Sequence, residues 1–231
     1  MSANSSIWHF LDSGDGEAAW NMAVDEALLE AVADLRGPVL RFYSWSTPAA
    51  TFGYFQKYAD VGQMTALRPL IRRPTGGGLV PHKNDWTYSV AIPPAHEWYQ
   101  LTAVASYQRM HEWLRAAFAA LNVSTELAPC CQPEGPGQCF LGAEKFDLLW
   151  HGRKIAGAAQ RRNKLGLLIQ GSVQPQPEGA SRAQWENAMR EVAGAQHLAK
   201  NWKILTPDFA QHRAEELAGQ KYRQTEYNQK R

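Results

Sequence analysis

The chain has 231 residues, of which 45% are hydrophobic and 20% are charged, and its formal net charge at pH 7 is +2. That length and composition are enough to bury a sizeable hydrophobic core. The small net charge excludes a global electrostatic field directed at a polyanion, and no run of residues is long and apolar enough to predict a membrane-spanning helix.

Helical and extended patterns alternate through the first half of the chain. Apolar residues at helical spacing predict a helix over residues 17–34, and Gly37 and Pro38 end it. Strands are predicted at residues 39–45, 50–54, 70–73 and 86–92. The third of these strands leads directly into a loop of Pro74, Thr75 and three consecutive glycines.

The second half begins with the longest predicted helix, over residues 99–121, and a Pro- and Gly-rich irregular segment follows at 129–137. Three strand-like runs come next, one from residue 140 or 145 to 150 and two at 154–161 and 167–173. The short turns between them imply antiparallel pairing. Helices at 181–193 and 207–218 precede a polar tail, from residue 221, that we expect to fray.

These elements predict an α/β (α+β) class with a mixed sheet, in a single domain over residues 1–231 whose C-terminal end, at about 176–220, is helical. The first residues lack the basic and apolar regions of a signal peptide. We therefore expect a cytoplasmic location, in which the three cysteines stay reduced.

Cys139 stands fifteen residues before Lys154, and a Gly-Arg turn separates the apolar runs between them. A thiol can hold an acyl group as a thioester, and a fixed ammonium can bind the carbonyl oxygen of that group. The pair therefore suggests acyl transfer through a covalent intermediate. Taken alone, however, a single cysteine is more often a small apolar filler, and a hairpin lysine is more often solvated.

The segment from Arg72 to Gly78 has the sequence Arg-Arg-Pro-Thr-Gly-Gly-Gly. Glycines without Cβ atoms allow backbone N–H groups to approach a ligand closely, and the arginines add charge for a phosphate or a carboxylate. The segment matches neither a Walker loop nor the dinucleotide pattern GxGxxG. Alone, such a turn is more often a flexible connection than a ligand site.

Charge is unevenly placed, because residues 148–177 contain no acidic side chain. The segment is either a solvated basic hairpin or a landing surface for an acidic partner, and charge alone does not distinguish the two. Its cations are Arg153, Lys154, Arg161, Arg162 and Lys164.

Metal and nucleic-acid sites are weakly supported. Cys130, Cys131 and Cys139 with His151 form a poor zinc set, since no CxxC pair is present. The cations are few and match no known nucleic-acid module. We therefore predict no metal site and no nucleic-acid or membrane partner.

Four segments, taken together and in order, are more specific than any one of them. Residues 72–90 contain an RRxTGG loop, a histidine and a Thr-Tyr-Ser strand, and residues 152–162 have the pattern G-[RK]-K-x-x-G-x-A-Q-R. With residues 21–27 and 39–45, they resemble the family of lipoate–protein ligase A and the octanoyltransferases, over roughly residues 8 to 175.

The resemblance implies the catalytic domain shared with biotin–protein ligases and class II aminoacyl-tRNA synthetases, a mixed and largely antiparallel sheet flanked by helices. Ligases of this family use ATP and Mg²⁺ to adenylate lipoate and pass it to a lysine of a lipoyl domain. Octanoyltransferases use no cofactor. They move octanoate from acyl carrier protein to a cysteine and then to such a lysine, in the glycine cleavage H protein or a 2-oxoacid dehydrogenase E2.

The interval between Cys139 and Lys154 matches the LipM-type octanoyltransferases, so octanoyl transfer is the favoured activity. Gly78 completes the three-glycine form found in ligases, so an ATP-dependent lipoate ligase stays open as the alternative. A non-catalytic relative that binds lipoyl domains is a third possibility, against which the presence of both residues argues.

The resemblance makes Cys139 the nucleophile and Lys154 the group that binds the acyl carbonyl. His82 is either a general base or a structural histidine. The residues that the resemblance places in substrate binding are Arg73, Thr75, Gly76, Gly77, Gly78, His82, Gly157 and Ala158.

Overall fold

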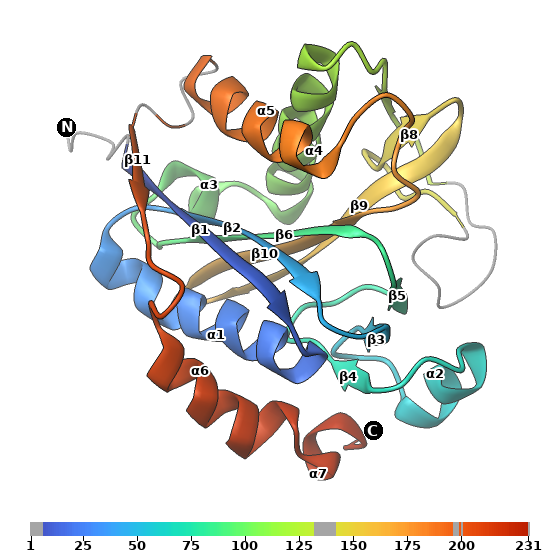
Figure 1. Ribbon diagram of the computed structural model, residues 1–231, viewed down its shortest axis with the longest axis vertical. Helices are drawn as coiled ribbons and strands as arrows, with labels where there is room; N and C mark the ends of the chain where they lie inside the picture. Colours follow the sequence, from blue (N-terminus) through green and yellow to red (C-terminus); the bar gives the residue numbers. More distant parts are fainter. Residues whose placement is uncertain (1–6, 132–141, 196–198, 200, 231) are drawn as a thin grey trace.

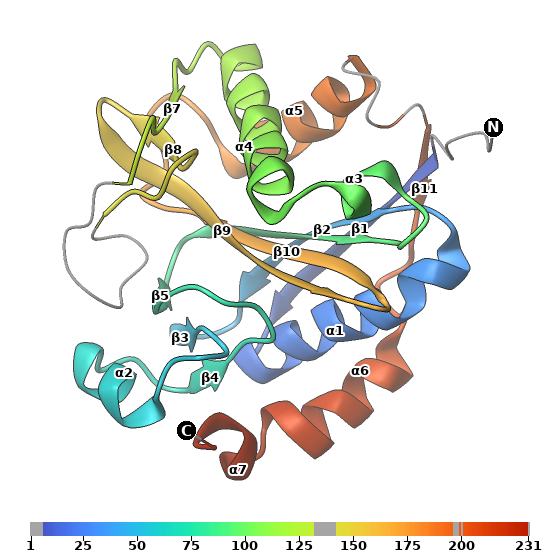
Figure 2. The same ribbon diagram turned by 180° about the vertical axis from the view of Figure 1, so that it is seen from behind.

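The computed structural model describes residues 7–131, 142–195, 199 and 201–230. An eight-stranded sheet in the order β11-β1-β2-β6-β10-β9-β8-β7 runs through the molecule (Figure 1, Figure 2). The pairs β1–β11 and β1–β2 are parallel and the remaining pairs are antiparallel, which confirms a mixed, largely antiparallel sheet. The strands are β1 (Ile7–Gly16), β2 (Val39–Trp45), β6 (Trp86–Ile92), β7 (Glu126–Leu127), β8 (Leu148–Trp150), β9 (Arg153–Asn163), β10 (Gly166–Val173) and β11 (Asn201–Ile204).

Helices cover both faces of this sheet. On one face lie α3 (Glu97–Gln100), α4 (Ala103–Ala120) and α5 (Arg182–Ala195), where Trp113 and Trp185 are fully buried in the larger hydrophobic core. On the other face lies α1 (Ala18–Leu35), with α6 (Gln211–Leu217) packed outside it (Figure 1). Most of the buried residues of α1 are apolar, with Asn21 and Asp25 as polar exceptions, and Arg36 in the left-handed conformation ends the helix.

A smaller sheet in the order β4-β3-β5 lies beside α2 (Tyr58–Met64). Its strands are β3 (Ala49–Phe52), β4 (Leu70–Arg72) and β5 (Val80–His82). Phe52, Val61 and Leu79 form its own hydrophobic cluster. The glycine-rich segment connects β4 to β5 in the sequence. Because both strands pair with β3, the two ends of this segment are held in place.

Most predicted elements are confirmed, and the strands at 39–45 and 86–92 have the predicted ends. The single helix over 99–121 is wrong, because the chain breaks at Leu101 and Thr102 between α3 and α4. The Thr102 hydroxyl accepts a hydrogen bond from the N–H of Ala105 and so starts a new helix. The sequence interpretation also missed β1, β5, β7, β11 and α2.

The tail does not fray as predicted. It continues as the π-helical turn η1 (Ala218–Tyr222) and the short helix α7 (Thr225–Asn228). Tyr222 is fully buried, and its hydroxyl lies 2.6 Å from a carboxylate oxygen of Glu26 on α1. The tail is therefore part of the packed structure.

The cations of residues 153–164 do not form one basic surface. Lys154 is nearly buried, Arg161 approaches Glu26, and Arg162 donates to the carbonyl of Tyr99. Only Arg153 and Lys164 of the five are exposed; Arg153 begins β9 and Lys164 directly follows its last residue. The alternation of a strand sends neighbouring side chains to opposite faces, so these cations are spread over more than one face. A landing surface for an acidic partner at this segment stays a prediction.

Within the described ranges, no helix has the length and apolar character that crossing a membrane requires.

Candidate active site

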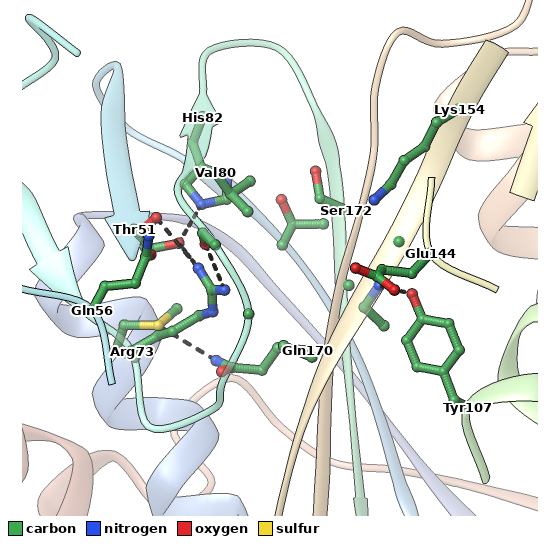
Figure 3. A pocket seen from close by; sticks show the side chains of 18 of the residues that line it. Thr51, Gln56, Arg73, Val80, His82, Tyr107, Glu144, Lys154, Gln170 and Ser172 are labelled. Atoms are coloured by element: carbon green, nitrogen blue, oxygen red, sulfur yellow. Dashed lines mark hydrogen bonds between the residues drawn. The ribbon is translucent and has the colours of Figure 1, made fainter. Parts of the chain in front are cut away.

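A cavity of about 440 Å³ lies between the large sheet and the small one. Figure 3 shows Lys154 on one side of it and Thr51, His82 and Arg73 on the other. Its volume is in the range of small-molecule sites. Its lining includes Met22, Tyr43, Trp45, Thr51, Gln56, Arg73, Gly77, Gly78, Val80, His82, Thr87, Tyr107, Glu144, Lys154, Gly157, Ala158, Ala159, Gln170, Gly171 and Ser172.

Lys154, near the start of β9, is fixed by a carboxylate that sequence reasoning missed. Its Nζ lies 2.7 Å from Oδ2 of Asp147, and the two side chains are 8% and 0% exposed. Asp147 also accepts hydrogen bonds from the Tyr107 hydroxyl and from the N–H of Glu144. Burial and the charge of Asp147 raise the pKa of Tyr107 well above its ordinary value, so Tyr107 stays a hydroxyl donor. The ammonium is therefore held in one orientation toward the cavity.

Gly157 and Ala158 line the cavity beside this ion pair. A Cβ at Gly157 would lie 2.8 Å from Cε and 3.0 Å from Nζ of Lys154. The N–H of Ala158 donates to the Tyr107 hydroxyl over 3.2 Å. Gly157 thus provides space for Lys154, and Ala158 supports the hydrogen-bond network around it.

The glycine segment is shaped from within by Arg73. Its Nε donates to the carbonyl of Gly76 at 3.0 Å, and its Nη2 donates to that of Gly78 at 2.7 Å. Gly77 has a φ of 81°, a conformation that favours glycine. Gly77 and Gly78 line the cavity, whereas Gly76 is not among the lining residues.

The side chain of Arg72 binds backbone carbonyl groups outside this segment. It donates to the carbonyls of Tyr54 and Gln56 and to those of Tyr227 and Asn228 in α7. A fully buried guanidinium satisfied in this way fixes backbone positions.

Thr75 is fully buried and contacts the cavity only indirectly, through Gln170. Its hydroxyl donates to Oε1 of Gln170 at 2.7 Å, and Gln170, not Thr75, lines the cavity. The Nε2 of Gln170 donates in turn to Asp25 of α1, which is paired with Arg41 at 2.7 Å. A buried polar network therefore ties the glycine segment to the large sheet and to α1.

His82 is held by three neighbours. Its Nδ1 lies 2.8 Å from Oδ2 of Asp85, its Nε2 lies 2.8 Å from Oγ1 of Thr51, and the ring of Trp45 stacks on it at 3.7 Å. Burial favours the neutral form of Asp85, but the charge of His82 and hydrogen bonds from His82, Ser172 and Thr87 outweigh it and lower the pKa. Asp85 is therefore a carboxylate at neutral pH, so Nδ1 of His82 carries the proton.

Sequence reasoning missed Thr51, Asp85 and Asp147. Asp85 has a local signal, since it stands three residues after His82, and Asp147 stands seven residues before Lys154. Thr51 has no such signal, because only the pairing of β3 with β5 brings it to His82.

Cys139 lies outside the described residues. Gly142, the third residue after it, lines the cavity, as does Glu144. Cys131 is exposed, and its Sγ lies 3.0 Å from Oε2 of Glu144. Among the residues that the structure describes, no group of three or more His, Cys, Asp or Glu could hold a metal ion.

Curated proteins with similar sequences include several named octanoyltransferase LipM. The one from Anoxybacillus flavithermus is 36% identical over 181 residues, which are 72% of this chain and 65% of that protein. The one from Bacillus subtilis is 34% identical over 179 residues, which are 72% and 64% of the two chains. The aligned part of this chain thus spans just under two thirds of the length of these relatives.

Similar solved structures include lipoate ligases. A lipoate-protein ligase A bound with ATP superposes with a TM-score of 0.75 at 21% identity, over 96% of this chain and 97% of that one. A bipartite lipoate protein ligase from Thermoplasma acidophilum, solved in a study that includes its E2 lipoyl domain, has a TM-score of 0.67 at 20% identity, over 96% and 95% of the chains. These identities establish the shared fold alone. The sequence model of the lipoyl protein ligase A/B catalytic domain matches residues 17–192 of the 231, and the chain therefore belongs to that family.

Proposed function

We propose that the protein is an octanoyltransferase that moves an octanoyl group from acyl carrier protein to a lysine of a lipoyl domain through a thioester on Cys139. The observation that carries this proposal is the ion-paired ammonium of Lys154 directed into a cavity built by the family's segments. The names of the similar curated proteins support the transferase over the ligase.

The proposed mechanism has two acyl transfers. The Cys139 thiolate attacks the thioester of the octanoyl carrier protein, the new C–S bond forms, the C–S bond to the carrier breaks, and the carrier leaves as a thiolate. The amine of the acceptor lysine then attacks the enzyme thioester, and the cysteine thiol leaves. In both steps the ammonium of Lys154 donates hydrogen bonds to the oxyanion that develops on the acyl carbonyl.

The partners and requirements follow from this chemistry. The donor is octanoyl acyl carrier protein, and the acceptor is a lipoyl domain of the glycine cleavage H protein or of a 2-oxoacid dehydrogenase E2. Neither transfer consumes ATP or needs a metal ion. An ATP-dependent lipoate ligase is the second candidate, which the three-glycine segment and the fold shared with an ATP-bound ligase favour.

The test is an intact-mass measurement after incubation with octanoyl carrier protein in the absence of ATP. We expect one octanoyl adduct that hydroxylamine removes, that Cys139→Ala abolishes and that the neighbouring-thiol control Cys131→Ala retains. Lys154→Ala should lower the transfer rate by about 10²- to 10³-fold, the usual effect of losing an oxyanion donor.

Two other results of this experiment would support the alternative functions. Modification of the lipoyl domain only when free acid and ATP are supplied supports the ligase. Binding of the lipoyl domain without any acylation, under both conditions, supports a non-catalytic relative.

A further inference from the structure

The proposed second transfer, on which this inference rests, needs a group that removes a proton from the acceptor lysine. A free lysine has a pKa of about 10.4, so it is almost entirely an ammonium at pH 7 and has no lone pair for attack. Lys154 does not supply the base as it stands, because an ammonium paired with Asp147 at 2.7 Å likewise has no lone pair.

Few side chains of the cavity can accept a proton. Tyr43 and Tyr107 donate their hydroxyls to carboxylates, and Arg73 has no acceptor atom. Among the described lining residues, Glu144 and His82 are left as bases. Glu144 is exposed and binds the thiol of Cys131, whereas His82 is 4% exposed and rigidly held.

The tautomer of His82 determines which of its ring nitrogens can accept a proton from the side of the cavity. The Asp85 carboxylate accepts the hydrogen of Nδ1, so in the neutral imidazole Nε2 is the acceptor. The hydroxyl of Thr51, which also lines the cavity, donates to Nε2 over 2.8 Å. Asp85, His82 and Thr51 therefore form a carboxylate–imidazole–hydroxyl chain that ends at the cavity, as Figure 3 shows for Thr51 and His82.

We propose that Thr51 is a catalytic residue that relays the proton of the acceptor lysine to His82. The ammonium gives one proton to Oγ1 of Thr51 while the hydroxyl proton of Thr51 passes to Nε2 of His82. Asp85 is a positioning residue that holds the tautomer and stabilises the imidazolium.

The step balances. The neutral amine attacks the acyl carbonyl, the N–C bond forms and the C–S bond breaks. Of the three protons on the ammonium, one goes to His82 through Thr51, one goes to the leaving sulfur as the tetrahedral intermediate collapses, and one stays on the amide. The imidazolium then releases its proton to solvent through the same hydroxyl.

Neighbouring side chains hold the Asp85–His82–Thr51 hydrogen-bond chain in position. Ser172 and Thr87 both donate to Oδ2 of Asp85, at 2.7 and 3.0 Å. Trp45 covers one face of the imidazole. Among the described residues, the charged groups in contact with His82 and Thr51 are Asp85, from the turn after β5, and Arg73, directly after β4. The Nη1 of Arg73 lies 3.4 Å from Oγ1 of Thr51.

The experiment separates the two transfers. Enzyme is first loaded with octanoyl carrier protein and the rate of adduct formation is measured, and then lipoyl domain is added and the rate of adduct loss is measured. Thr51→Val keeps the shape of the side chain but removes the hydroxyl, so loading should stay within about threefold of wild type while transfer at pH 7 slows by about 10²-fold. Thr51→Ser keeps the hydroxyl and should transfer at nearly the wild-type rate.

Measuring the transfer rate over a range of pH distinguishes a proton relay through Thr51 from a purely structural role of this residue. Near pH 10 the acceptor lysine is already partly neutral, so the difference between Thr51→Val and wild type should narrow. Glu144→Gln should leave both rates nearly unchanged. The relay is refuted if Thr51→Val transfers like wild type, if it loses loading and transfer equally, or if Glu144→Gln alone removes transfer. Absence of any adduct on the wild-type enzyme refutes the proposed function instead.

Discussion

Gly157 occupies the position at which a side chain would displace the ammonium of Lys154. A Cβ there would lie 3.0 Å from Nζ of Lys154 and 3.1 Å from Oδ1 of Asp147, closer than most real contacts. We expect Gly157→Ala to push the lysine from its place and to slow acyl transfer by about 10- to 100-fold, as misplacement by about 1 Å can. The measurement is the rate of octanoyl transfer to a lipoyl domain.

The matched control is Gly76→Ala in the glycine segment. No atom lies within 4 Å of a Cβ at Gly76, and this residue is not among the lining residues. Its transfer rate should stay near that of wild type. Equal losses in both variants would mean that glycine flexibility, and not space beside Lys154, matters at position 157.

The site could be predicted only where its residues belong to a recognisable segment. Lys154, the glycine segment and His82 were found in this way, and the structure places them around one cavity. Asp147 and Thr51 were not found, because their roles depend on which strands and turns meet in space. Whether the predicted residues bind substrate stays a prediction.

Among the elements, the short helix α7 holds the chain at Arg72, shortly before the three glycines. Asn228 is 7% exposed, and its Oδ1 accepts the N–H of Arg72 at 2.8 Å. Its Nδ2 donates to the carbonyls of Tyr222 and Gln224, both at 2.9 Å. Asn228→Ala leaves these buried groups without their partner, so we expect a loss of about 1–3 kcal/mol in the free energy of unfolding, measured in urea.

Because Arg72 directly precedes Arg73, this variant should also raise the KM for the acyl donor. Gln229→Ala, at the exposed next residue, is the control and should change the stability by less than about 0.5 kcal/mol. An Asn228→Ala protein as stable as wild type would show that α7 merely rests on the surface.

The helices and strands differ in how well their own residues predict them. Long periodic segments such as α1, β2 and β6 were predictable from their own residues. The strand β1 was missed because it contains Asp12, Ser13 and Asp15, and its pairing with β2 and β11 decides its conformation. The polar tail was predicted to fray because its composition does not reveal that α1 and Arg72 provide partners for Tyr222 and Asn228.

At the scale of the whole molecule, we expect two buried histidines, His9 and His111, and the half-buried His96 to make folding sensitive to acid. Burial is the largest cause that lowers the pKa of His9, His96 and His111, and nearby cations, Lys203, Arg109 and Lys154 respectively, lower it further. Glu97 raises the pKa of His96 and Asp147 raises that of His111, without reversing either shift. In each case the folded protein therefore favours the neutral imidazole.

The sign of the pH dependence follows from linkage. A histidine in the unfolded chain has a pKa of about 6.5, so below that pH the unfolded state binds protons that the folded state does not. The stability that these three residues contribute is therefore fully present above about pH 6.5 and is lost as the pH falls toward their lower folded-state pKa values. We expect the free energy of unfolding, measured by urea denaturation, to decrease steadily from pH 7 to pH 5.

His111→Phe tests the origin of that slope. His111 is fully buried on α4, its Nδ1 donates to the carbonyl of Tyr107, and its Nε2 has no hydrogen-bond partner among the described residues. A phenyl ring fills similar space but cannot bind a proton, so the decrease in stability between pH 7 and pH 5 should be smaller than in wild type. His212→Gln, at a side chain that is 92% exposed, replaces a histidine without changing the core and serves as the control. If His111→Phe and wild type lose stability in parallel over this range, proton binding at His111 does not contribute to the acid sensitivity.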